Sequence, residues 1–390
     1  MRKILILLGT TSLAACGGGG PVTVGGSAVA GGGAGTASPH TFVNPTDPKT
    51  YQATGGMQHY RFKTREEDPL TPPEVRFNQY GQLYAGDANT ARDSGYEVTY
   101  NPRDGIFDLS IKSPKSETDL VTRFQDPAHR TAFGGASFPQ DGTPDLTSKG
   151  VIYFENGSAS GVFNTDGFQS QEQTFFYQKP GTTTKYVTYA GYLRNKVNQT
   201  ATDNGSGGTF IETSYERKRG AFVFGQRSAN AGVPKTGTGT FSGQMIASMI
   251  YNPLLDTADN TPSFYQWMDG TSSMAVDFGA NSFTLALAAT VGAPQFDFHS
   301  DRIFDMPAGS TFNADGAGRI DLVNAGGFLG QFTSAYFAKG GIRRDLVIAG
   351  SSIDGAFYGP TAQEVGGGFR IVGGTPDERI DILGAFTGGR

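Results

Sequence analysis

Short runs in which apolar and polar residues alternate recur along the chain from residue 41 onward. Alternation with a period of two is typical of β-strands that bury one face, and a helical period is almost absent. In the first half these runs lie at 58–63, 74–78, 96–100, 106–112, 151–155, 174–178, 186–193 and 220–226. The sequence Asn-Pro-Arg-Asp-Gly at 101–105 favours a hairpin turn, because proline presets the first bend and Asp-Gly tolerates positive φ. We therefore expect a mostly antiparallel β domain over 41–235.

Two polar stretches interrupt this pattern, at 113–150 and 195–209. Both are rich in Pro, Gly, Ser and Asn. Such composition is typical of loops, and loops of this length inside a compact domain are often functional or disordered. The sequence predicts long loops here without indicating a role for them.

A second set of alternating runs follows the turn residues at 234–237. Two of these runs flank Gly279-Ala280-Asn281 and predict a tight hairpin. The eight runs lie at 238–245, 274–278, 282–287, 318–323, 328–337, 353–358, 367–372 and 380–386. Eight antiparallel strands suffice to close a small barrel filled by its own side chains. We therefore expect an all-β fold in which an antiparallel domain precedes an eight-stranded barrel at 236–390.

The N-terminus has the pattern of an exported lipoprotein. A short basic start and an apolar segment precede Leu13-Ala14-Ala15-Cys16, a small-residue cleavage site that ends at the single cysteine of the chain. We expect residues 1–15 to be a lipoprotein signal peptide and Cys16 to be acylated, which would anchor the protein to outer-membrane lipid. The apolar segment is too short to span a bilayer. The stretch 16–40 is uncharged after Cys16 and rich in glycine, which favours a flexible tether.

Composition supports the β interpretation and narrows the partners. The chain has 57 Gly, 29 Phe and 16 Tyr, a mixture suited to short strands with tight corners. Its 31 basic and 36 acidic residues give a net charge of −5, which argues against a nucleic-acid partner. Motifs of serine hydrolases, zinc enzymes and nucleotide-binding loops do not occur, so we predict no enzyme, no catalytic residue, no metal site and no cofactor. Four widely spaced histidines offer haem or metal ligation only as a minor alternative.

One motif near the C-terminus organises the barrel. Gly359-Pro360 forms the corner between two glycine-rich strands, and the geometry of a closing barrel explains most of the motif. We assign this structural closure role to Gly355, Phe357, Tyr358, Gly359, Pro360, Glu364, Gly367 and Phe369. A ligand contact by Tyr358 or Glu364 is the alternative.

This G-x-F-Y-G-P-x-A-x-E-x-G-G-x-F motif resembles the last barrel strands of the transferrin-binding protein B family of bacterial surface lipoproteins. The G-T-F-S-G strand at 239–243, the V-D-F-G-A-N-S-F hairpin at 276–283 and the L-G-A-F end at 383–386 match in the same order. The resemblance implies that 41–235 is a handle-like domain. It also implies a lipid-anchored outer-membrane protein, displayed at the cell surface, that captures an iron carrier or haem for a TonB-dependent outer-membrane transporter. The family has two handle-plus-barrel lobes, this chain has room for one, and no transferrin-contacting motif carries over.

The cluster Phe264, Tyr265 and Trp267 is the candidate for ligand binding. Proline and aspartate residues flank it, so we expect a loop between barrel strands, and aromatic loop residues often dominate binding energy. The alternative is that this cluster plugs the barrel end. At the level of function, a structural or adhesive surface lipoprotein without a transport role is the alternative to a co-receptor.

Overall fold

The alternating residues form strands throughout the computed structural model. It describes residues 42–66, 78–80, 95–111, 120–125, 142–203, 205, 207–252, 264–296, 306–374 and 379–390. Within these ranges the helical turns are short, η2 (Thr147–Lys149) and η3 (Asn230–Gly232), and every strand pairing is antiparallel. The predicted all-β antiparallel fold is thus confirmed. No helix in these ranges is long and apolar enough to cross a membrane. Cys16, the signal peptide and the tether lie outside the described residues.

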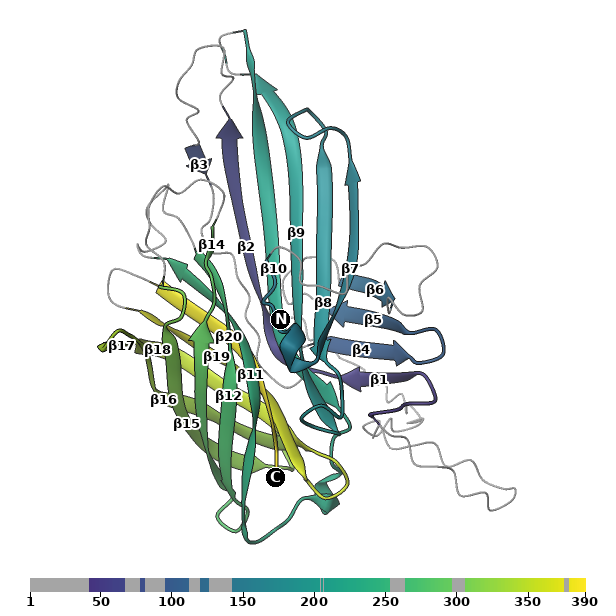
Figure 1. Cartoon of the computed structure of the whole chain (residues 1–390), viewed down its shortest axis with the longest axis vertical. Helices are drawn as coiled ribbons and strands as arrows, with labels where there is room; N and C mark the ends of the chain where they lie inside the picture. The colour runs from purple at the N-terminus through teal and green to yellow at the C-terminus, as the bar shows by residue number, and fades with distance from the viewer. Residues whose placement is uncertain are drawn as a thin grey trace, which may run out of the picture. The chain divides into compact units, whose positions relative to one another are not determined.

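A six-stranded sheet forms the first part of the fold (Figure 1). Its order is β3 (Asn78–Tyr80), β2 (Thr54–Glu66), β10 (Thr209–Gly225), β9 (Val187–Asp203), β8 (Gln169–Gln178) and β7 (Val151–Ser160). Strands β9 and β10 have 17 residues each, which at ~3.4 Å per residue makes them roughly 55 Å long.

The prediction of a long loop at 195–209 is wrong. Residues up to Asp203 continue β9, and they pair with β10 from Thr209 onward. Polar residues occupy this part of the strands because it extends beyond the sheet's apolar core, so their composition resembled that of a loop. Part of the other predicted loop, at 113–150, is also regular, because it contains β6 (Leu120–Gln125) and η2.

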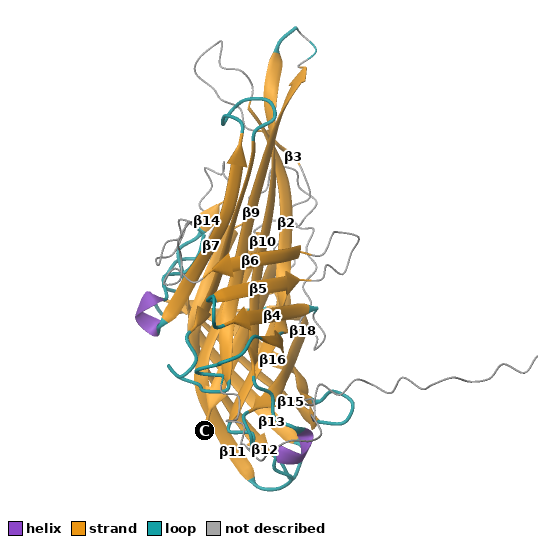
Figure 2. Ribbon diagram, turned by 90° about the vertical axis from the view of Figure 1, so that its right-hand side faces the viewer, coloured by secondary structure: helices purple, strands orange, loops and turns teal. Residues whose placement is uncertain are grey.

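A four-stranded sheet packs across the six-stranded one (Figure 2). Its order is β1 (Lys49–Gln52), β4 (Tyr96–Asn101), β5 (Ile106–Ile111) and β6. The predicted turn at 101–105 joins β4 to β5, with Gly105 at φ +60°. Aromatic rings dominate the core between the two sheets, among them Phe107, Phe124, Phe154, Phe175, Tyr192 and Phe222.

The second part of the fold is a closed barrel of eight antiparallel strands, as predicted. They are β11 (Thr238–Asn252), β12 (Phe264–Asp277), β13 (Ser282–Val291), β15 (Thr311–Asp321), β16 (Gly327–Lys339), β18 (Val347–Tyr358), β19 (Glu364–Gly374) and β20 (Arg379–Gly389). Strand β11 pairs with both β12 and β20, which closes the barrel. Two short strands, β14 (Gln295–Phe296) and β17 (Ile342–Asp345), pair with β12 and β16.

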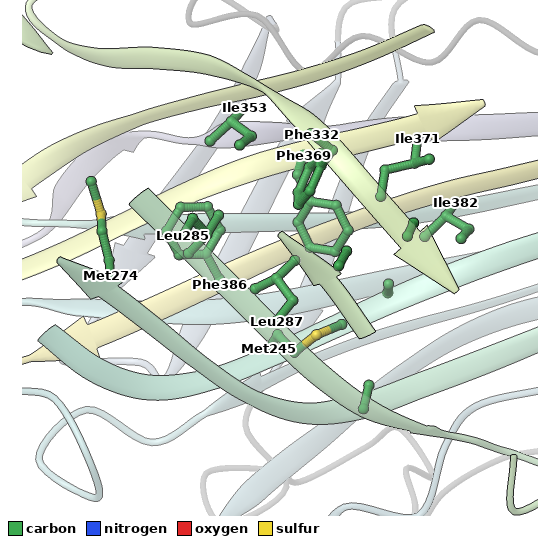
Figure 3. Packing of buried hydrophobic residues seen from close by; sticks show 14 of the residues in the cluster. Met245, Met274, Leu285, Leu287, Phe332, Ile353, Phe369, Ile371, Ile382 and Phe386 are labelled. Carbon is green, nitrogen blue, oxygen red and sulfur yellow. The ribbon is translucent and has the colours of Figure 1, made fainter. Parts of the chain in front are cut away.

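Apolar side chains fill the inside of the barrel (Figure 3). Alternate residues of each strand point inward, and they interlock from opposite walls, including Met245, Met274, Leu285, Phe332, Phe369 and Phe386. All of these side chains are buried. The described part of the barrel is therefore a packed core, as expected when eight strands close on one another.

Residues 40–390 form one compact unit. The predicted boundary between a handle-like domain at 41–235 and a barrel at 236–390 coincides with the change from one sheet to the next. The two parts nevertheless pack together within a single compact unit. The boundary stays a prediction.

Candidate binding surface

The barrel packs against the six-stranded sheet through a buried junction. From the sheet side it contains Phe176, Tyr189 and Val223, and from the barrel side Ile246, Trp267, Tyr358 and Ala385. At one point the two backbones touch. A Cβ added to Gly368 in β19 would lie 2.6 Å from the Cα of Gly55 in β2, so only a glycine fits there.

Trp267 and Tyr265 lie within this junction, not in a loop. They belong to β12, whose alternate residues Gln266 and Met268 are buried on the barrel's inner side. The loop expectation is therefore corrected: the strand begins at Phe264, which pairs with Tyr251 and Phe296. The flanking prolines and aspartates lie before this strand, and they misled the assignment of the aromatic residues.

Trp267 has a complete set of partners in the junction. Its side chain is 5% exposed, and its Nε1 donates a 2.6 Å hydrogen bond to the carbonyl oxygen of Gly142. Its ring meets Phe176 edge-on, with centroids 5.5 Å apart. A ligand would reach this indole only if the sheet and the barrel separated. Ligand binding by Phe264, Tyr265 and Trp267 stays a prediction.

Two arginines of β10 cover the same aromatic side chains. The Arg219 guanidinium lies 4.6 Å from the ring centroid of Tyr265 and 5.9 Å from that of Trp267, and Arg217 lies 5.5 Å from Tyr265. Burial, and to a smaller extent the neighbouring Arg217, lower the pKa of Arg219 to about 9. Cation–π contacts of this kind stabilise a charge that has little water around it. Tyr265 and Trp267 thus have a structural explanation within the protein.

The closure motif forms the hairpin between β18 and β19, where Gly355 faces Gly367 and Phe357 faces Val365. Gly359 takes φ +83° at the corner, before Pro360. Phe357 and Phe369 point into the barrel core, whereas Tyr358 is buried in the junction.

Glu364 joins the barrel to the six-stranded sheet. Its carboxylate accepts backbone N–H groups of Lys185 (2.6 Å), Tyr186 (2.8 Å) and Val187 (3.1 Å) at the start of β9. Burial raises the pKa of this carboxyl group, and the three amide hydrogen bonds offset part of that rise. The geometry therefore supports a structural role for Glu364, in which it caps a neighbouring strand.

An ordered loop at the end of the β7–β8 hairpin, residues 161–168, presents apolar side chains to solvent. Val162 is 68% exposed and Phe163 is 56% exposed. Phe163 is supported edge-on by Phe168, with ring centroids 5.4 Å apart. An exposed aromatic side chain held on a hairpin end is a candidate binding contact, since aromatic residues are enriched among binding hot spots.

Buried Gln199 of β9 holds this loop in place. Its Oε1 accepts the N–H of Asn164 (2.7 Å), and its backbone bonds to Gly167 (3.1 Å) and Phe168 (2.8 Å). Its Nε2 also donates to the hydroxyl of Thr213 (3.1 Å). The loop conformation is thus fixed before any partner arrives, which reduces the entropy lost on binding.

Sequence reasoning did not identify this loop. The signal was present, since Val162-Phe163 is flanked by Gly161 and by Asn-Thr-Asp-Gly at 164–167. Such an apolar pair between turn residues indicates an exposed hairpin end. The fixed conformation of this loop depends on Gln199, which is more than 30 residues away in sequence.

The positions of the described residues do not support the alternative of metal or haem ligation by histidine. His59 lies 3.7 Å from Glu216, and the other three histidines lie outside the described residues. Groups of three or more His, Cys, Asp or Glu that could hold a metal are absent from the part of the chain that the structure describes.

Comparison with known proteins finds a family similarity over the barrel. Residues 233–390 match the family model described as the C-lobe and N-lobe beta barrels of Tf-binding protein B. No curated protein matches the chain. Similar solved structures include intact Ap-TbpB with its N and C lobes, at 11% identity and TM-score 0.28, covering 88% of this chain and 79% of that one. A mutant of transferrin binding protein B from Haemophilus parasuis Hp5 has 12% identity and TM-score 0.27, with 89% and 79% covered.

Proposed function

Because residues 233–390 form a barrel of the Tf-binding protein B family, we propose that this protein is a lipid-anchored surface receptor that binds its ligand without chemical conversion. It would be held in the outer membrane through acylated Cys16. It would capture an extracellular iron carrier or haem and pass it to an outer-membrane transporter. The family is named for binding rather than catalysis.

The filled barrel is the observation that carries this proposal. Its interior is occupied by the protein's own Phe, Met, Leu and Ile side chains, which favours a ligand site outside the barrel core. A ligand is therefore expected to bind on outer surfaces. The family barrel then serves as a rigid support for loops and for the six-stranded sheet.

The 161–168 loop is the best-defined binding element on these surfaces. Val162 and Phe163 protrude, while the N–H of Asn164 donates to Gln199, which in turn donates to Thr213. The projection that Val162 and Phe163 form fits a shallow apolar pocket on a protein, and aromatic residues dominate such contacts. A protein carrier is therefore favoured over a small charged solute at this loop.

The surface location is tested first by protease treatment of intact cells. We expect the protein to be cleaved on intact cells as readily as in lysates, and a Cys16→Ser variant to be released from the membrane fraction. A periplasmic protein of known location serves as the control for cell integrity. Protection until lysis would overturn the surface-receptor proposal.

The binding role of the loop is tested with Phe163→Ser. We expect affinity for the captured carrier to fall about tenfold or more, because a central aromatic contact is lost. Iron-loaded transferrin and haemoglobin are the first probes, and surface plasmon resonance gives the affinity. Val323→Ser is the matched control, since Val323 is 89% exposed at a barrel turn.

Equal affinity of wild-type protein and Phe163→Ser for a carrier that both bind would exclude the loop as the contact. A comparable loss in Val323→Ser would indicate that general surface hydrophobicity, and not this loop, determines binding.

A further inference from the structure

One face of the six-stranded sheet changes character along its length. Near the four-stranded sheet, it buries Met57, Phe175, Tyr192 and Phe222 in the aromatic core. Because side chains alternate between the two faces of a strand, the residues two or four positions further along share this face. The strand register places His59, Lys218 and Arg194 side by side in the next row.

These side chains gather around one carboxylate. Arg194 donates to Glu216, and Lys218 and Arg61 each have a nitrogen 3.8 Å from its oxygens. His59 is 3.7 Å away. Arg194, Lys218 and Glu216 are largely buried, whereas Arg61 is half-exposed. The cluster is therefore fixed at its base and open at its outer end.

The basic character continues beyond this cluster. Lys63 of β2 is half-exposed and forms a 2.7 Å ion pair with Glu212, and the register places Lys196 beside Glu216. Over the described rows, this face carries five Lys or Arg residues and two Glu residues, in a chain with net charge −5. Uncharged hydrogen-bonding side chains lie between them, including Gln171, Gln173, Asn198 and Ser214.

We infer that this face is a docking surface for an acidic region of a protein partner. A positive face on an acidic protein is complementary to a negative one and speeds the encounter with it. The two glutamates among the basic residues lower the positive charge density of this face, which favours the spaced acidic residues of a protein over a uniform polyanion such as polyphosphate. The upper parts of β9 and β10 extend beyond β4, β5 and β6, which leaves the face uncovered by those strands (Figure 2).

The spacing of the basic side chains on β2 suits an extended partner. His59, Arg61 and Lys63 repeat every second residue, so their origins lie about 7 Å apart along the strand. An extended segment with an acidic residue at every second position has the same repeat. This inference concerns a surface other than the apolar loop, and it does not depend on which carrier that loop binds.

Binding of a fluorescent peptide of alternating glutamate and serine tests the inference. Anisotropy would be measured with the full chain at low and at physiological ionic strength, with inorganic polyphosphate as competitor. We expect saturable binding that weakens with salt. The double variant Lys63→Glu/Lys196→Glu should bind about tenfold more weakly or worse, because two attractive contacts become repulsive.

The matched control is Lys179→Glu/Lys235→Glu, which makes the same change in net charge at exposed sites outside this face. It should bind the peptide as the unmodified chain does, and circular dichroism would show that both double variants are folded. Absence of saturable binding, or an equal loss in the control, would overturn the inference. Stronger binding of polyphosphate than of the peptide would also overturn it, since the partner would then be a polyanion and not a protein.

Discussion

Replacing Trp267 with alanine is expected to lower the free energy of unfolding by about 3–5 kcal/mol. The indole is buried between the sheet and the barrel, packs on Phe176 and bonds to Gly142. Its removal leaves a cavity in the junction and an unpaired carbonyl group. Urea unfolding followed by tyrosine fluorescence would measure the change, and Trp267→Phe should lose less because it refills most of the cavity.

This expectation separates the two roles considered for Trp267. A structural role predicts a large loss of stability, with binding preserved under conditions where the variant remains folded. A ligand-contact role predicts the reverse, namely lost binding with stability unchanged. The second outcome would restore the aromatic cluster as a binding site and would require the junction to open.

Glu364→Ala is expected to lower the free energy of unfolding by about 3 kcal/mol, because three backbone N–H groups lose a charged acceptor. Glu364→Gln should have an intermediate effect, since one acceptor oxygen remains while its NH₂ group faces the same donors. Thermal unfolding by circular dichroism would give the order. Glu172→Ala removes an exposed glutamate of β8 and is the control.

Unchanged stability in Glu364→Ala would mean that water replaces the carboxylate at the start of β9. That result would favour the alternative role of Glu364 as a ligand contact, because the carboxylate would then have no structural role in the closure motif.

Local pattern was sufficient to predict most of the barrel. The hairpin around Asn281 and the corner at Gly359 require positive φ and were identified from glycine and asparagine alone. Alternation then placed all eight barrel strands, since each strand buries one face in the core. The end of β9 escaped because both of its faces are largely polar there, so alternation gives no signal.

The candidate sites depended on long-range contacts that no local pattern contains. Trp267 looks like a loop aromatic until Phe176 and Gly142 are seen beside it. Glu364 caps residues about 180 positions earlier in the chain. The basic face of the six-stranded sheet can be recognised only from the register of β2, β10 and β9. Arg61, Arg194 and Lys218 are far apart in the sequence and form no local motif there.

The pairing of β11 with β20 also constrains how the protein reaches its folded state. Ser242 lies opposite Gly389, so the barrel joins its first strand to its last. A contact between residues so far apart in the sequence forms slowly, because the entropy of closing the long intervening loop is lost before the contact contributes stabilising energy. Until the final strand arrives, β11 and β19 each have an unpaired edge, and such edges are templates for aggregation. Barrel closure is therefore expected to be a late step of folding, and the chain is most exposed to aggregation just before β20 joins β11 and β19.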